Sequence, residues 1–335
     1  DEKMLQADQQ EFDQIVSSIN RISRNTQYGN NNLLDGSGAG NGVTTGKNLS
    51  FVDAKTTGIS SGVKGYDIDI FRAASRSKHT GTVNLNQNII DKGEQITITE
   101  AGRSVDFKTE AGTSIEQTMN QLTNAIKEAG LNVELVIPQG SNRNAPQKLT
   151  IRHKNYGSDE FFQVSSNTAG LLSKASNVSH KVQNGVDVAG EIAGEGAIGK
   201  GQILTGAGGY GSKNEGISIR YAGDKAPPRG QRAGTITFSQ NSLTFQIGSN
   251  ANQTAKVSMK STRAENLGNG VANDSGFRSF ADINLMTGDG ARDAIEIIDK
   301  AIKDVAANRG YLGAFQKNTL ESNLGYLRIA HESAV

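Results

Sequence analysis

The sequence predicts an α+β fold in which a discontinuous helical, coiled-coil-like shaft domain from both chain ends carries a β-rich inserted outer domain. Two observations predict this division. Near both ends, apolar residues recur at steps of three and four, which places them on one face of a helix. Through the middle of the chain, apolar residues alternate with polar ones, which is typical of strands with one solvated face.

The first helix is predicted over residues 2–23. Its apolar residues share one stripe, with polar residues opposite, and are Leu5, Phe12, Ile15, Ile19 and Ile22. The run 25–32, Asn-Thr-Gln-Tyr-Gly-Asn-Asn-Asn, is rich in residues that favour turns and tolerate a left-handed backbone. We therefore expect the helix to end there.

A second stripe runs through the last part of the chain. Its apolar residues are Ala291, Ile295, Ile298, Ile302, Val305 and Leu312. Arg309 takes one expected apolar position, and the stripe continues with Leu320, Leu324 and Leu327. Since a narrow seam at this spacing is what a coiled-coil contact requires, we expect the two stripes to pack against each other, with the chain termini side by side.

Between the helical ends, alternating segments predict antiparallel strands. The clearest segments are residues 66–70, 95–99, 149–152, 216–221 and 235–238. One helix is predicted to begin after Ser114, which can cap it with Gln117 three residues later, and to end at Gly130. The glycine-rich run 185–211 predicts a loop region.

These patterns divide the chain into three parts. Residues 1–65 are expected to form the N-terminal part of the shaft domain, and residues 241–335 its C-terminal part. Residues 66–240 are expected to form the outer domain, with two subdomains at about 66–180 and 181–240.

The composition excludes several classes of function. The charges nearly cancel, since 35 Lys and Arg against 34 Asp and Glu leave +1, so no global field attracts nucleic acid or an anionic membrane. The chain has no Cys, which excludes disulfides and thiolate metal sites. No apolar run approaches the roughly 20 residues that a membrane span needs. The chain begins at Asp1 without a visible signal peptide, so we expect a fragment of a longer protein.

Two glycine-rich segments come near nucleotide-binding motifs but lack the context that these motifs need. Residues 206–211 have the spacing of a dinucleotide-binding fingerprint, yet an alternating segment follows where a helix is required. Residues 194–201 come near a P-loop, but Gly201 stands where a Ser or Thr must bind magnesium. We expect neither segment to bind a nucleotide.

The remaining polar residues predict no active site. The four histidines are far apart in the sequence and lack metal-ligand spacing, which favours solvated or edge-strand positions; they are His79, His153, His180 and His331. Asp67 and Asp69 share a strand face but lack the loop glycine and distal Glu of a hand-type calcium site. We expect no catalytic residue, no cofactor and no metal, because no nucleophile–base pair or paired acids are visible.

The segments at the two ends resemble the bacterial flagellin family. Near the start these are residues 11–15 (Glu-Phe-Asp-Gln-Ile), 19–22 and 26–36. Toward the end they are residues 245–250, 291–305 and 309–316. The resemblance begins one helix late and stops before the family's C-terminal end. Between Gln316 and Glu321 this chain has one residue more than many relatives, which rotates the later stripe of a helix by about 100°.

A weaker resemblance extends to the middle of the chain. Residues 93–165 resemble a small insert module of flagellins and of axial hook-associated proteins. Residues 216–223 and 234–239 resemble a segment of the filament-cap protein. These likenesses imply an insert that projects from the helical shaft as a separate outer domain.

The resemblance implies a structural, non-enzymatic subunit of an extracellular flagellar filament, which assembles with copies of itself through its terminal helices. Subunit and helix packing is expected to rest on Phe12, Ile15, Ile19, Ile22, Ile295, Ile298, Ile302, Leu312 and Gln316. Arg21 and Arg309 are expected to hydrogen-bond across helix or subunit boundaries, because Arg309 in an apolar stripe is costly unless paired. Glu11 falls where the family's immune-receptor surface continues.

The implied partners include hook-junction and cap proteins. A second hypothesis keeps the flagellin-like shaft but gives the outer domain a binding role at the cell surface. In that case, basic loops such as the one with Arg72, Arg76 and Lys78 recognise a polysaccharide or a host molecule. A hydrolase in the insert is the third and weakest hypothesis.

Overall fold

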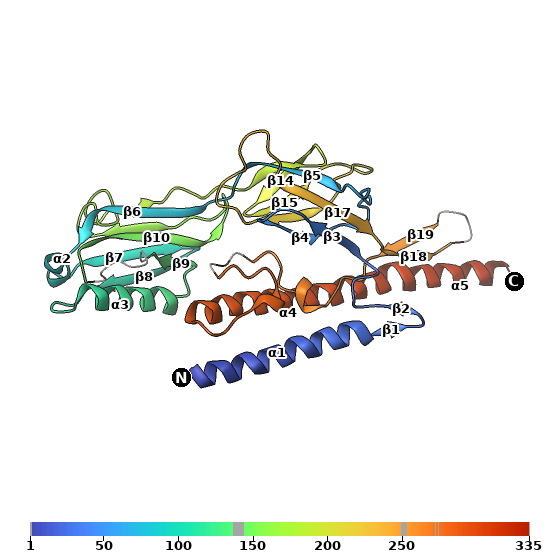
Figure 1. Ribbon diagram of the computed structural model, residues 1–335, viewed down its shortest axis with the longest axis horizontal. Coiled ribbons are helices and arrows are strands. Elements are labelled where there is room, and N and C mark those ends of the chain that lie inside the picture. Colours follow the sequence, from blue (N-terminus) through green and yellow to red (C-terminus); the bar gives the residue numbers. More distant parts are fainter. Residues whose placement is uncertain (1, 137–143, 249–252, 272, 274, 335) are drawn as a thin grey trace.

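The computed structural model describes residues 2–334 except 137–143, 249–252, 272 and 274. It is a mixed α+β structure of three units, each with its own buried apolar cluster. The helical unit comes from both chain ends, the central sheet unit lies beside it, and the distal unit lies beyond the central sheet (Figure 1).

The helical unit contains the longest helices of the chain. Its N-terminal elements are α1 (Glu2–Asn25) and the hairpin β1 (Gln27–Tyr28) and β2 (Asn31–Asn32). Its C-terminal elements are β18 (Leu243–Gln246), β19 (Thr254–Val257), η1 (Ala264–Asn266), η2 (Phe280–Asp282), α4 (Gly288–Phe315), η3 (Gln316–Glu321) and α5 (Ser322–Ala334). In the described part of the chain, no helix combines the length and apolar character of a membrane span.

Helices α1 and α4 run in the same direction, so the two ends of the chain lie at opposite ends of the helical unit (Figure 1). The expectation that the termini lie side by side is wrong. Apolar periodicity defines the face that a helix buries but carries no information on whether two helices run parallel or antiparallel. The long β-rich insert provides enough chain to return to the start of α1 before α4 begins.

The segment from Gln316 to Glu321 is a π-helix that joins α4 to α5 without a break. A π-helical turn closes its hydrogen bonds over five residues rather than four, so it holds one residue more than an α-helical turn. The extra residue noted between Gln316 and Glu321 lies in this wider turn, and the helix continues to Ala334.

The central sheet unit is an antiparallel sheet in the order β3-β17-β5-β13-β14-β15-β16-β4. Its strands are β3 (Gly40–Thr44), β4 (Leu49–Asp53), β5 (Tyr66–Arg72), β13 (Ala189–Ile192), β14 (Glu195–Lys200), β15 (Ile203–Gly206), β16 (Ser218–Tyr221) and β17 (Gly234–Gln240). The edge strands β3 and β4 are consecutive in the chain and touch, with Thr44 Oγ1 donating to the carbonyl of Leu49 at 3.0 Å. The sheet therefore curls until its edges meet.

The central sheet is built from several separate parts of the chain. Residues 40–53 supply both of its edge strands, and Leu49 and Phe51 of β4 pack on its core. The distal unit, about residues 76–183, is inserted between β5 and β13 of the same sheet. The distal unit is therefore nested within the chain segment that forms the central sheet.

The glycine-rich run 185–211 contains strands β13, β14 and β15, so its interpretation as a loop region is wrong. The glycines are present because neighbouring backbone comes close to them. A Cβ added at Gly199 would lie 1.7 Å from the carbonyl oxygen of Val188, and one at Gly206 would lie 1.8 Å from that of Asn214. These glycines remove the apolar alternation by which strands are usually predicted.

The distal unit has two antiparallel sheets, in the orders β6-β10-β9 and β12-β11-β7-β8. Its elements are β6 (Arg76–Leu85), α2 (Gln87–Asp91), β7 (Gln95–Glu100), β8 (Arg103–Lys108), α3 (Ile115–Glu128), β9 (Val133–Leu135), β10 (Gln147–Tyr156), β11 (Gln163–Ser166) and β12 (His180–Lys181). Ser114 and Gln117 cap α3 reciprocally, which confirms the predicted helix start. The inner face of α3 joins both sheets in one core.

Candidate assembly surface

Helix α1 is held to the rest of the helical unit by an aromatic contact. Phe12 is only 7% exposed, and its ring centroid lies 5.0 Å from that of Phe280 in η2. Val16 and Ile19 pack on the same cluster, which also contains Ile297 of α4. The residues at helical spacing from Phe12 therefore form the inner face of α1, and other residues of the same chain cover this face.

Side-chain amides of α1 fix its position along the cluster. Gln9 Oε1 accepts a hydrogen bond from the backbone N–H of Leu285 at 2.7 Å, and its Nε2 donates to the carbonyl of Ile283 at 3.3 Å. One end of η1 is held by Asn20, whose Oδ1 accepts from the N–H of Ala264 at 2.9 Å. These bonds satisfy loop backbone that would otherwise be unpaired beside an apolar cluster.

Helix α4 has two apolar faces, and the chain covers one of them. The covered face consists of small residues and one large one, namely Gly290, Ala294, Ile297 and Ala301. The predicted stripe is a different face, since Ile295 and Ile302 are 61% and 62% exposed and only Ile298 packs partly on the cluster. At 100° per residue, the exposed isoleucines lie roughly 120° around the helix from the covered face.

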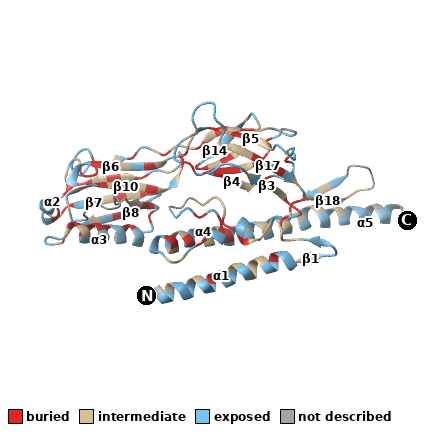
Figure 2. Cartoon of the chain, in the orientation of Figure 1, coloured by how far each residue is buried: buried red, intermediate tan, exposed pale blue. Residues whose placement is uncertain are grey.

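Helix α1 has a similar uncovered strip. Ile15 and Ile22 are 46% and 57% exposed, although they belong to the same predicted stripe as Phe12 and Ile19. Figure 2 shows that α1 is largely exposed. Phe12, Ile19 and Ile298 of the two predicted stripes enter one cluster, which also contains Leu267, Phe280 and Ile283 from η1, η2 and their flanking loops.

The polar residues predicted for this surface are all exposed. Arg21 and Arg309 make no hydrogen bond or ion pair to any other residue that the structure describes, so contacts across subunit boundaries remain a proposal. Gln316 donates to Glu321 Oε1 at 3.2 Å within η3. Leu312 is half-buried, and Glu11 is exposed on α1.

The apolar surface continues along α5. Leu320, Leu324 and Leu327 are all exposed, in the wider π-helical turn and the helix that follows it. The hairpin of β18 and β19 supports the junction, since Phe245 lies 6.2 Å from Phe315 between ring centroids. Asn323 Nδ2 donates to the carbonyl of Ile247 on the same side.

The residues of η1, η2 and their loops hold α1 in place, and the apolar pattern of the sequence does not identify them. Helix α1 packs on four apolar residues of this segment, namely Leu267, Phe277, Phe280 and Ile283. The segment has no helical or strand period, so neither pattern identified it. A signal was nevertheless present, because two phenylalanines three residues apart in a chain with only 11 indicate buried aromatic anchors.

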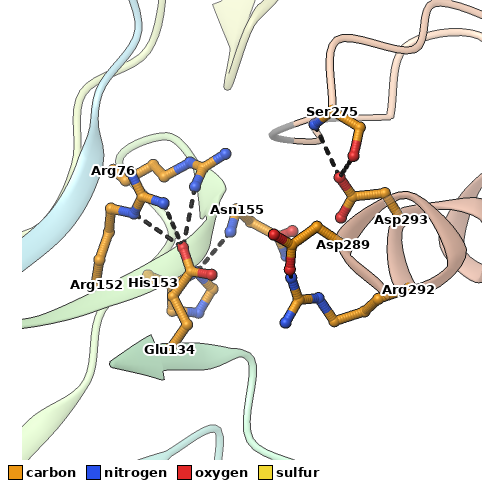
Figure 3. Close-up of polar contacts among 9 residues, drawn as sticks. All are labelled: Arg76, Glu134, Arg152, His153, Asn155, Ser275, Asp289, Arg292 and Asp293. Atoms are coloured by element: carbon orange, nitrogen blue, oxygen red, sulfur yellow. Dashed lines mark hydrogen bonds and ion pairs between the residues drawn. The ribbon is translucent and has the colours of Figure 1, made fainter. Parts of the chain in front are cut away.

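The distal unit presents a charged cluster near the start of α4 (Figure 3). Glu134 Oε1 accepts from Arg152 at 2.6 and 2.9 Å and from Arg76 at 3.2 Å. Across from it, Asp289 pairs with Arg292, and Asp293 accepts from Ser275. Desolvation raises the pKa of Glu296, and the neighbouring carboxylates Asp293 and Glu134 add to this, against the opposing effect of Lys154.

No family model matches the chain. Among curated proteins, the chain is 34% identical over 133 residues to the flagellin of Bacillus subtilis (strain 168). This match covers 36% of the chain and 43% of that flagellin, so the chain spans less than half of the length of the relative.

The comparison with solved structures includes domains of the flagellar cap protein FliD. The D2-D3 domains of FliD from Escherichia coli match 60% of this chain and 100% of that chain, with 16% identity and a TM-score of 0.41. The D1-D2-D3 domains from the same organism match 71% of this chain and 62% of that chain, with 14% identity and a TM-score of 0.42.

Proposed function

We propose that the chain is a structural, non-enzymatic subunit of a bacterial flagellar filament, and that it assembles with its own copies outside the cell. The exposed faces of α1, α4 and α5 are the contact surfaces, and the two β units face solvent. In this proposal the two chain ends together form the shaft domain, and hook-junction and cap proteins meet the same helical faces at the filament ends. The partial sequence match to a flagellin supports this reading.

The observation that carries the proposal is the second apolar face of α4. A helix within a monomer normally buries its large aliphatic residues and exposes small or polar ones. Here Ala294 and Ala301 are covered, while Ile295 and Ile302 are exposed. An apolar face of this kind, rimmed by charged residues, is typical of protein–protein contacts.

The repeating contact joins unlike surfaces. A face of one copy that binds a different face of the next copy does not close on itself and extends into a helical fibre. Arg21 and Arg309 stand on these exposed helices as unpaired cations among the described residues, and we propose that each donates to a carbonyl or carboxylate of a neighbouring copy. Phe12 and Ile19 hold α1 in position by packing on the buried cluster beneath this surface.

The alternative role of the outer domain in binding a polysaccharide has weaker support. Of the three basic residues predicted for it, Arg76 has a side chain only 5% exposed, and it is ion-paired with Glu134. Recognition by an immune receptor at Glu11 also stays a prediction, supported only by the exposure of that residue.

The test is assembly of the longest natural form of the chain with Ile302→Asp or Ile15→Asp, observed by electron microscopy and sedimentation. We expect monomers with an almost unchanged melting temperature and no filaments, because a charge at an exposed position is costly only once a partner covers it. Val63→Asp is the matched control, since Val63 is 99% exposed but lies in the central sheet unit. Filaments of normal length from Ile302→Asp and Ile15→Asp contradict the proposal.

A further inference from the structure

Two histidines from distant parts of the sequence lie side by side in the distal unit. His79 is in β6, opposite Ile151 of β10, and His180 begins the two-residue edge strand β12, opposite Val164 of β11. Their ring centroids are 5.1 Å apart, and the ring planes are tilted by 54°. The two strands belong to different sheets, so the pair lies where the sheets meet.

The proton of His79 is fixed on one nitrogen. Nε2 lies 2.6 Å from the carbonyl oxygen of Leu172. Since a carbonyl oxygen only accepts, Nε2 carries the hydrogen and Nδ1 keeps its lone pair. Metal-binding histidines commonly have this arrangement, in which one ring N–H donates to a backbone carbonyl and the other nitrogen binds the ion.

The spacing of the rings fits two imidazoles on one ion. Nitrogen–metal distances of about 2.0–2.1 Å, with an angle near tetrahedral, place two ring centroids roughly 5 Å apart. The His180 ring is half-buried and makes no hydrogen bond to another residue in the described ranges of the chain. Its nitrogens are therefore free to turn toward a ligand without the loss of an internal bond.

We propose that His79 and His180 form a binding site for a divalent late transition-metal ion, Cu²⁺ above all, and Ni²⁺ or Zn²⁺ more weakly. Imidazole nitrogen suits these ions, and their affinities follow the Irving–Williams order. No cluster of three or more His, Asp or Glu in the described residues could hold a metal, so water fills the remaining positions. The site is accordingly weaker than a closed four-ligand zinc site.

Two lysines, Lys174 and Lys181, belong to the surroundings of the histidine pair. Lys174 is the nearby cation that weakens binding, whereas Lys181 lies over the Phe161 ring at 4.1 Å from its centroid.

His153 provides an instructive contrast. It is fully buried, and its Nδ1 accepts from the N–H of Asn155 at 3.0 Å, so its hydrogen is on Nε2. That Nε2–H faces Glu100 Oε1 at 3.5 Å and Glu160 Oε2 at 3.4 Å. One nitrogen of His153 accepts a backbone hydrogen bond and the other faces two carboxylates, so His153 is not part of the proposed site.

A metal ion at this site would link the two sheets of the distal unit. Strand β12 pairs with β11 over two residues, so it is among the weakest elements of the distal unit. An ion that binds His180 and His79 together binds only the folded arrangement and stabilises it by mass action. We expect the melting temperature of the distal unit to rise with the concentration of the metal.

The experiment is a titration of the untagged full chain with CuCl₂, NiCl₂ or ZnCl₂ at neutral pH, by calorimetry, with electron paramagnetic resonance for Cu²⁺. We expect saturable binding at one site per chain, tightest for Cu²⁺, with nitrogen coupling in the spectrum. His79→Gln and His180→Gln should each weaken binding by at least about tenfold. His331→Gln, at an exposed position on α5, should bind like the wild type.

The variants are chosen so that folding and binding can be separated. Glutamine at position 79 keeps an N–H donor for the carbonyl of Leu172 while it removes the imidazole lone pair. If His79→Gln lowers the metal-free melting temperature, metal binding by His180→Gln tests the proposal, because the His180 ring has no internal hydrogen bond that the substitution would remove. Wild-type affinity in both variants, or no saturable binding to the wild type, overturns the proposal.

Discussion

Replacement of Phe12 by alanine tests how α1 is held to the chain. Phe12 is 7% exposed and lies against the Phe280 ring, in a cluster that also contains Ile283 and Ile297. Few other large side chains of α1 enter this cluster, so loss of the ring leaves a cavity rather than a repacked contact. We expect α1 to separate from the helical unit far more often in Phe12→Ala.

The magnitude follows from burial. Truncation of a buried phenylalanine to alanine costs about 3–5 kcal/mol, and this includes the cavity that remains. Alanine is the better helix former by about 0.5 kcal/mol, which offsets a small part of the cost. The expected net loss is about 3 kcal/mol, or roughly two orders of magnitude in the population of open α1.

The assay is amide hydrogen exchange of α1 peptides by mass spectrometry, because the chain has no Trp to report local opening and exchange resolves one helix from the rest. Ile22→Ala is the matched control, since Ile22 lies on the same helix but is 57% exposed. We expect its exchange to change by less than about 0.5 kcal/mol. An opening energy for Phe12→Ala within about 1 kcal/mol of wild type refutes the reasoning, as does an equal effect of Ile22→Ala.

Two further changes test the β units. Gly81→Ala should destabilise the distal unit by about 2 kcal/mol or more in denaturant unfolding, because the added Cβ would lie 1.9 Å from the carbonyl oxygen of Leu171. Gly196→Ala is the control and should be nearly neutral, since open space surrounds Gly196. Burial raises the pKa of Asp187, but hydrogen bonds from Ser158 and from backbone N–H groups outweigh burial and lower the pKa below 3.8. Stability from this carboxylate is therefore present above pH 3.8 and lost as the pH falls through the lower folded value, so Asp187→Asn should flatten the melting temperature against pH below about 4.

Strong periodic segments were predictable because a single physical rule determines them. The span of α1, the capped start of α3, and strands such as β5 and β17 follow from one buried face each. Strands β13 to β15 escaped prediction because close backbone approach requires glycine at positions such as Gly199, where an apolar residue would have given the signal. At these positions the tertiary structure requires a glycine, whereas a strand is recognised in the sequence by an apolar residue.

The histidine pair and the contacts of α1 could not be predicted from the sequence for a different reason. The pairing of His79 with His180 depends on the contact between two sheets, and no spacing within the sequence encodes it. The segment of η1 and η2 on which α1 packs is irregular, so its apolar residues recur with neither a helical nor a strand period. Sequence patterns describe which face of an element is apolar, and they do not say what covers that face.

This limit explains the stripe on α4. The pattern singled out Ile295, Ile298 and Ile302 because they are large and regularly spaced, and their packing partner was expected inside the chain. The structure covers Ala294 and Ala301, because small residues let the loops of η1 and η2 approach the helix closely. Exposed isoleucines cost solvation free energy of about 1.5–3 kcal/mol each relative to burial. Because α4 exposes Ile295 and Ile302, it recovers that free energy only when another molecule covers these two side chains.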